Sequence, residues 1–580
     1  RKLFLLVSLL VTVLYGASLW KFTDAASYRV VDNYLPLAVL VAMFIIGLIH
    51  TRVALWLALL LTLLLGNLGL LNELCIKVFH LPETAAVFTR FGSPTESVLL
   101  GLFAAWILKR FWGNAELDFE YNRAHAVRSL HFFVFLYGLT VVLAAAHSVL
   151  IAQNIFASTF FTQVRSLAAT LPFPFFSSPG LLAPLRLALT VLEAIIVYTI
   201  VTNEVRTMHQ MRGILWVLAA GAVIVCVIGW LQWQYDLSYG NGIWRYNKEV
   251  HSTFADPNTL GVFLVSLLPF CGALIRRGVA AGIAGGVIAA VLITGIVLTG
   301  TKSAILLAAL CIVVFVVARI LQSLRAKRTT AALAAVLVLV LIAALLNGVR
   351  FMGKNPEMKW AAGISRKIED TSRAVCTGKW NLQGINDRTN FKLGDWLTGA
   401  KALKAEGGKI AAAGAGLGRF KAIYSQYRSD VTSRSREGAS NMFIQTWVET
   451  GAMGLVALLV ISIGAIAAGV RAAKKAEHPF CVRCVPLGLL VLVAACLVED
   501  SFQQTQLQVV FWAYVGLCMV ASSLTAREET PRGSGLVKFV LVLLALAATA
   551  WVFHPVIKQQ HEESVTLKDL TARYAQKYNL

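Results

Sequence analysis

Long apolar runs dominate the sequence. Stretches of roughly 20 mostly apolar residues follow one another along the chain, the length at which a helix crosses a bilayer core. Only helices satisfy their backbone groups within one such segment, and the short alternating segments of a membrane β-barrel are absent from the sequence. We therefore predict an all-α, polytopic transmembrane helical bundle of about 15 spans. The predicted centres lie near Val11, Ala42, Leu63, Phe103, Leu139, Val191, Ala222, Ser266, Ala289, Ile312, Leu339, Ala457, Val493, Ala513 and Leu543.

The short joins between these runs differ in charge. Lys and Arg concentrate in the joins after the even-numbered spans, and the positive-inside rule places those joins in the cytoplasm. The joins after odd-numbered spans then face outward, which in a Gram-negative inner membrane is the periplasm. The basic joins contain Arg52; Lys109 and Arg110; Arg206 and Arg212; Arg276 and Arg277; Arg325, Lys327 and Arg328; Arg471, Lys474 and Lys475; Arg527 and Arg532.

Composition agrees with a membrane protein. Of the 580 residues, 58% are hydrophobic and only 14% are charged, whereas a soluble domain has about 25% charged residues. The net charge of +22 would suggest nucleic acid in a soluble chain, but no nucleic-acid-binding motif accompanies it, so we expect no nucleic-acid partner. Cys481 and Cys484 form a CxxC pair without a second pair or a His partner, so we predict no metal site and no cofactor.

One outward segment, residues 349–440, is too long for a bare connection and is expected to be structured and functional. It contains 17 Lys and Arg against 8 Asp and Glu, a net charge of +9 that suggests anion binding. The alternative is that long outer loops escape the charge rule. The predicted divisions are N-terminal spans 1–205, central spans 206–348, the large periplasmic loop 349–440, C-terminal spans 441–556 and a polar tail 557–580.

The first polar patch lies at residues 244–261. Asp256, Pro257 and Asn258 open a long apolar helix, which is the usual composition of a helix cap and leaves open a purely structural role for Asp256 and Asn258. Because the start of a helix favours an anion, the preceding side chains are candidate anion ligands. These are Arg245, Lys248 and His251.

A second patch is the short outward turn at residues 298–307. Lys302 follows a Gly/Thr turn there and is suited to holding a phosphate, although a Lys that snorkels to the membrane interface would look the same. Ionisable residues inside spans are costly, and they are usually functional or paired. They are Arg186 and Glu193 in the sixth span, and Glu499 and Asp500 at the end of the thirteenth.

The large loop and its exit carry the remaining motifs. The glycine run at residues 414–420, with Gly414, Gly416 and Gly418, does not follow a strand, so a dinucleotide-binding interpretation fails. The other polar and aromatic candidates are Arg388, Trp396, Arg428, Ser440, Asn441 and Glu449.

In this order, the patches resemble the O-antigen ligase and O-antigen polymerase family of bacterial envelope glycosyltransferases. The resemblance rests on Phe254–Asn258, Thr299–Ser303, Arg388 with Trp396, Gly414–Phe420, and Asn441 with Glu449–Gly454. It covers about half of the chain, from roughly 210 to 525.

The resemblance implies a membrane glycosyltransferase of the GT-C-like helical class, with a periplasmic cavity. Members of the family transfer a glycan from an undecaprenyl-diphosphate carrier to the lipid A core of lipopolysaccharide or to another lipid-linked glycan. They are described as metal-independent and inverting, with Arg residues that hold the diphosphate and a loop His that assists the acceptor. Arg388 matches the loop Arg, and Lys302 takes the basic position in the short turn.

The sequence departs from the family pattern at one position. Ser440 precedes Asn441 where the ligases have His, and a serine cannot act as a base at neutral pH. Either His251 or Glu449 takes this role, or the position has been engineered, or the chain uses another acceptor or has lost transferase activity. We favour a working transferase with a relocated base.

Two other function classes stay open. A transporter or flippase of an anionic lipid-linked saccharide would fit the basic outward face, but the two-fold repeat typical of transporters is not evident. A non-catalytic assembly or sensor protein rests on Ser440 alone.

Overall fold

The computed structural model describes residues 34–78, 94–112, 125–155, 179–237, 249–275, 279–325, 392–404, 408–427, 438–476, 479–499 and 501–525. Within these ranges the chain is helical and contains no strand. The chain divides into two compact units. Unit 1 comprises Arg1–Val127, Glu193–Lys392 and Ser462–Glu529; unit 2 comprises Arg128–Leu192, Leu393–Ile461 and Thr530–Leu580.

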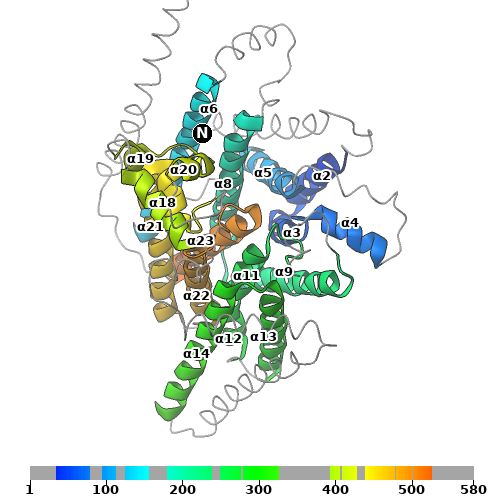
Figure 1. The fold of residues 1–580 in the computed structure, drawn as a ribbon. Helices are drawn as coiled ribbons and strands as arrows, with labels where there is room; N and C mark the ends of the chain where they lie inside the picture. Colours follow the sequence, from blue (N-terminus) through cyan, green and yellow to red (C-terminus); the bar gives the residue numbers. More distant parts are fainter. Residues whose placement is uncertain are drawn as a thin grey trace, which may run out of the picture. The chain divides into compact units, whose positions relative to one another are not determined.

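Most of the described apolar helices, which Figure 1 labels, belong to unit 1. They are α2 (Tyr34–Ile49), α3 (Thr51–Leu64), α4 (Leu68–Lys77), α5 (Pro94–Trp112), α9 (Met208–Gln234), α11 (Pro257–Ser266), α12 (Leu268–Ile275), α13 (Val279–Thr299), α14 (Lys302–Arg325), α22 (Pro479–Cys496) and α23 (Thr505–Thr525). The second halves of α8 (Pro179–Glu204) and α21 (Met442–Lys475) also belong to it.

Small residues set the closest helix contacts of unit 1. Helix α2 packs along α5, and a Cβ on Gly101 would lie 2.4 Å from the Leu40 carbonyl oxygen. Helices α3 and α9 pack together, as do α11, α12, α13 and α22. Glycines that let backbones approach are typical of helix pairs in membranes, where burial of apolar surface gives no drive to association.

Unit 2 has a small core of its own. It contains α6 (His125–Ile155) except its first three residues, α18 (Lys392–Lys404) except Lys392, α19 (Lys409–Ala413), α20 (Phe420–Tyr427) and the first halves of α8 and α21. Ala402, Ile410, Phe420, Tyr424 and Val448 are buried together. Short helices therefore form the described part of residues 392–427.

The helices agree with the predicted membrane character. Of the fifteen predicted centres, twelve lie in described helices, and those near Val11, Leu339 and Leu543 lie outside the described residues. Within the described residues, seven helical segments are long and apolar enough to cross a membrane, with α11 and α12 counted as one, and four shorter apolar helices accompany them. The protein is thus a helical membrane protein, and fifteen spans and the GT-C-like fold stay predictions.

Candidate functional site

A buried polar segment, residues 249–256, precedes α11 in unit 1. The Gln232 side chain of α9 accepts hydrogen bonds from the backbone N–H groups of His251 (3.2 Å) and Ser252 (2.8 Å). The Thr253 hydroxyl donates to the Leu63 carbonyl at the end of α3 (2.7 Å). Because these groups are shielded from water, each hydrogen bond is needed to hold the segment against α3 and α9.

His251 lies fully buried in this segment. Its Nδ1 is 3.1 Å from the Phe254 carbonyl oxygen, which can only accept, so Nδ1 carries the proton and Nε2 is a bare lone pair. Nε2 has no hydrogen-bond partner within the described residues. Burial lowers the pKa of the imidazole below its usual 6.5, against an opposing effect of the Phe254 and Ser252 backbone and of Asp256. His251 is therefore neutral at pH 7.

The Asp256 motif forms a helix cap, which is the structural one of the two roles left open by the sequence. The Asp256 carboxylate accepts from the Thr259 N–H (3.0 Å) and hydroxyl, and Pro257 takes the first helical position of α11. Asn258 is the exposed second residue of that helix. The structure thus accounts for Asp256 by capping alone.

The Lys302 turn packs on the same end of α11. Gly300 has φ +65°, and the Thr301 hydroxyl donates to the Pro257 carbonyl (3.1 Å). Gly261 allows this approach, since a Cβ there would lie 2.9 Å from the Ala304 Cβ. The turn leaves Lys302 exposed at the first residue of α14. Two motifs about 40 residues apart in sequence are therefore neighbours in unit 1.

A buried ion pair completes this region of unit 1, which we call the motif end. Lys392 Nζ lies 2.5 Å from the Glu499 carboxylate, and the Ser303 hydroxyl donates to the same carboxylate. The side chains of Lys392 and Glu499 are only 15% and 3% exposed. Glu499 was predicted to be functional or paired, and it is paired.

In unit 2, the glycine run is a site of close backbone packing. Gly414, Gly416 and Gly418 all have φ between +72° and +101°. A Cβ on Gly416 would lie 2.3 Å from Ser148 Oγ, and one on Gly414 would lie 2.4 Å from the Glu449 carbonyl oxygen. Only glycine fits these positions without strain.

A break in helix α21 supplies the hydrogen-bond acceptors for the backbone N–H groups of the glycine run. Gly451 has φ +76°, which interrupts the helix and prevents the usual i to i+4 bonds across it. The freed carbonyls of Val448 and Glu449 accept instead from the N–H groups of Ala415 (2.8 Å) and Gly416 (3.1 Å). The glycine run and the Glu449–Gly454 motif are therefore one structural feature.

Ser440 lies in the same unit, at the start of α21. It is a buried residue with φ +50°, and its hydroxyl donates to the Asp395 carboxylate (3.0 Å). The Trp396 indole N–H donates to the Ser440 carbonyl (3.3 Å). Asn441 caps α21, because its side-chain oxygen accepts from the N–H groups of Phe443 (2.9 Å) and Ile444 (3.1 Å).

Glu449 is buried on the following turns of α21. Its carboxylate accepts from the Gln445 amide (2.6 Å), and Gln445 in turn accepts from the Ala439 N–H (2.6 Å). His251, Ser440, Asn441 and Glu449 are all buried. Each of the four candidate catalytic residues therefore has a structural role in this conformation.

Several predicted anion ligands cannot be placed. Arg245, Lys248, Arg388 and Arg428 lie outside the described residues. Arg186 lies on α8, but its side chain is outside them too. Within the described residues, no group of three or more His, Cys, Asp and Glu side chains could hold a metal ion.

Sequence reasoning missed two residues. Lys392, which pairs with Glu499, was one of many cations in the large loop, and Asp395, which accepts from Ser440, was one of several carboxylates there. Both lie in the first turn of α18, next to Trp396, which was predicted. The available signal was that a Lys and an Asp three residues apart share a helix face beside a motif residue.

Comparison with known proteins identifies the family of the central segment. No curated protein matches the chain. The family model described as O-antigen ligase matches residues 287–459, which extend from within α13 to the first half of α21. The match contains the Lys302 turn, the glycine run and Glu449, and it confirms the resemblance seen in the sequence. Residues 287–459 of this helical membrane protein are therefore similar to the O-antigen ligase family.

Proposed function

We propose that the protein transfers a glycan from an undecaprenyl-diphosphate carrier to an acceptor at the periplasmic face of the inner membrane. The acceptor is the lipid A core or another lipid-linked glycan. The observation that carries the proposal is the family match at 287–459 over the segment that contains the exposed Lys302. In this proposal the predicted divisions hold, with residues 349–440 as the periplasmic loop.

The leaving group of this reaction is a diphosphate, whose departing charge must be stabilised. Lys302 is suited to this because its charge is exposed and it lies at the first residue of α14, where the helix dipole favours an anion. Lys392 is held by Glu499 and is not assigned to the diphosphate. Arg388, four residues earlier, is proposed as the bidentate diphosphate ligand, with Arg186, Arg245, Lys248 and Arg428 as further cations. Transfer would then need no metal, and the configuration at the sugar would be inverted.

Of the two candidate bases, we assign the role to His251 in preference to Glu449. His251 has a bare Nε2 in the neutral form that can take a proton, whereas the Glu449 carboxylate already accepts from Gln445. His251 is fully buried, so this assignment requires acceptor binding to open the segment 249–256. A positioned base contributes about 10²–10⁴-fold to a rate.

One assay tests the proposed activity. Purified protein in vesicles is incubated with undecaprenyl-diphosphate glycan and candidate acceptors, and both the free diphosphate carrier and the new glycoside are measured. We expect both products in equal amounts. Movement of the lipid-linked glycan across the bilayer without a new glycoside would instead establish a transporter.

Variants test the assigned residues in the same assay. Arg388→Ala should abolish transfer, and Lys302→Ala should reduce it about 10²-fold, the scale for loss of one group that stabilises developing negative charge. Lys475→Ala, which removes another exposed helical Lys, is the matched control and should transfer normally. Near-normal activity of Arg388→Ala would remove that residue from the site.

Two further variants address the base. His251→Gln should lower the rate at saturating donor by about 10²-fold or more. Glu449→Gln should retain most of the activity, and the reverse result would move the role to Glu449. Ser440→His restores the family residue at a φ that His tolerates, and a gain in rate would show that the base is limiting.

A further inference from the structure

A second polar region lies at the opposite ends of α3 and α9 from the motif end. A cavity of about 500 Å³ lies there, within unit 1. Its lining comes from the α2–α3 junction, the end of α5, the end of α8 and the start of α9. The lining residues are Ile49, His50, Thr51, Arg52, Val53, Trp56, Lys109, Glu204, His209 and Gln210. We call this the basic pocket.

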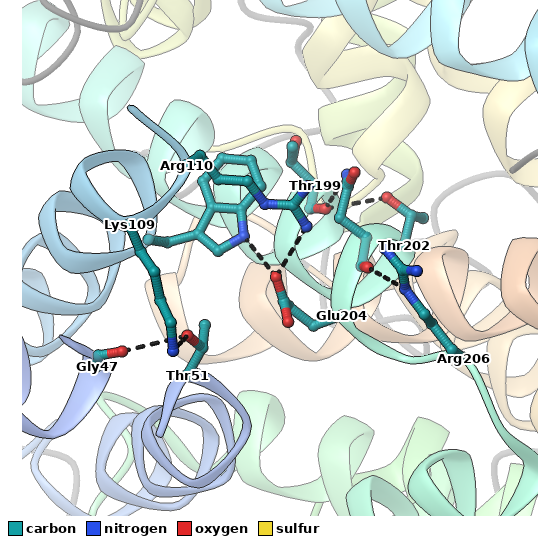
Figure 2. A network of polar contacts seen from close by, with 10 residues as sticks. Gly47, Thr51, Lys109, Arg110, Thr199, Thr202, Glu204 and Arg206 are labelled. Carbon is teal, nitrogen blue, oxygen red and sulfur yellow. Dashed lines mark hydrogen bonds and ion pairs between the residues drawn. The ribbon is translucent and has the colours of Figure 1, made fainter. Parts of the chain in front are cut away.

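The one carboxylate of the pocket lining is already neutralised. Glu204 Oε1 accepts from Arg110 (3.0 Å) and from the Trp106 indole (3.0 Å), and Arg110 also lies over the Trp106 ring (Figure 2). Arg110 is buried, so the protein itself supplies the cation that neutralises Glu204. With Glu204 neutralised, the remaining charged side chains of the pocket lining are positive.

The remaining lining cations are exposed. Among the described residues, Lys109 Nζ contacts the neutral Thr51 hydroxyl at 3.4 Å and forms no ion pair, and Figure 2 shows its side chain extended toward Thr51. Arg52 is also exposed, and among the described residues it has no ion pair. His50 and His209 are exposed lining residues as well. A pocket with two unneutralised cations of this kind favours an anion.

The backbone adds to this preference. Both α3 and α9 begin at the pocket, and the α3 N-cap residue, His50, makes no side-chain capping hydrogen bond. Positive ends of two helix dipoles therefore lie beside the cations of the lining. A phosphate group matches both features, since it accepts from helix N-termini and pairs with Arg and Lys.

An apolar track leads into the pocket. Val41, Ile45 and Ile49 lie four residues apart on one face of α2 and are 44%, 49% and 63% exposed. The track ends at the rim, where Ile49, Val53 and Trp56 line the cavity. An apolar strip that runs along a membrane helix into a basic pocket fits one molecule with an acyl chain and an anionic head.

We propose that the basic pocket binds the phosphate group of an anionic membrane phospholipid, whose acyl chain lies along α2. The charge pattern of the joins predicts that Arg52, Lys109 and Arg206 are cytoplasmic, and basic pockets between helices on that side are typical sites for such lipids. This site is separate from the proposed transferase residues, so the proposal does not depend on the transferase activity.

The test uses full-length protein in detergent, and its thermal unfolding midpoint is followed while lipid is added. Phosphatidylglycerol should raise the midpoint in a saturable way, because a ligand that binds the folded state stabilises it. Phosphatidylcholine at the same concentration should do so much less. Arg52→Gln should weaken the apparent affinity for phosphatidylglycerol roughly 5-fold, and the Arg52→Gln, Lys109→Gln pair about 25-fold.

The control variant is the Arg471→Gln, Lys475→Gln pair, which removes two exposed cations from the end of α21 in the same unit. It should bind phosphatidylglycerol like the unaltered protein. Equal weakening in both pairs would overturn the proposal, because the effect would then be general charge attraction. An equal midpoint shift with inorganic phosphate alone would overturn the lipid assignment, and no saturable shift would overturn the site.

Discussion

The two ends of helices α3 and α9 carry polar residues with different roles. At the motif end, α3 and α9 finish against the segment 249–256, where Gln232, Thr253 and the Lys392–Glu499 pair are buried and hydrogen-bonded to the protein. At the basic pocket, where α3 and α9 begin, Arg52 and Lys109 are exposed. Buried polar groups must find protein partners, whereas exposed ones keep water until a ligand replaces it. The difference predicts that substitutions at the motif end affect folding and those at the pocket affect binding.

The largest effect should follow from Lys392→Ala. This change leaves the Glu499 carboxylate buried without its cation, and breaking a buried pair on one side destabilises by about 3–5 kcal/mol. Lys109→Ala at the pocket, measured without lipid, should change stability by less than about 0.5 kcal/mol. Denaturant unfolding in detergent compares the two, and equal effects would break the contrast between the ends.

The next effect should come from Gln232→Leu. This substitution removes the acceptor of two buried N–H groups, those of His251 and Ser252, and should destabilise by about 2 kcal/mol or more. Gln210→Leu is the matched change at the pocket, where the Arg206 N–H that loses its partner is exposed to water. We expect at most about 0.5 kcal/mol there. The same unfolding measurement decides between these outcomes.

Burial of neutral His251 predicts a pH dependence at the motif end. Its pKa in the folded state lies below the usual 6.5, so at acidic pH the unfolded state binds the additional proton. The stabilisation that this residue contributes is present above pH 6.5 and is lost as the pH falls toward the folded-state pKa, with a slope of at most about 1.4 kcal/mol per pH unit. Unfolding midpoints from pH 7.5 to 5 should show this slope, and His251→Gln should lack that part of it.

The smallest effect should be found in the helix caps. Asp256→Ala removes acceptors of two hydrogen bonds from Thr259 at the start of α11, and should cost about 1–2 kcal/mol. Thr207→Ala removes a single 3.3 Å bond to the exposed Gln210 N–H at the start of α9, and should cost about 0.5 kcal/mol. A larger loss at Thr207 would contradict the view that exposure decides the outcome.

The sequence was informative where a pattern depends on local chain geometry. Asp256 followed by Pro257 has the composition of a helix cap, and it caps α11. The Lys302 turn, expected between two spans, lies between α13 and α14. The glycine run was recognised as unlike a nucleotide loop, but its partner was not foreseen. Its positive φ angles serve contact with the broken α21 at Gly451, far along the chain.

For the charged residues too, the sequence indicates some features and the tertiary structure decides others. Lys and Arg alternation predicted that Arg52, Lys109 and Arg206 share one side, because each membrane crossing reverses the side of the chain. The sequence by itself thus determined the apolar helices and the Asp256 cap, and it predicts a common side for these cations. Only the tertiary structure decided that Glu204 is neutralised by Arg110, that Glu499 holds Lys392, and that Arg52 and Lys109 are left to line a pocket. The reason is physical: burial and pairing depend on side chains that distant helices bring together, and no local pattern records them.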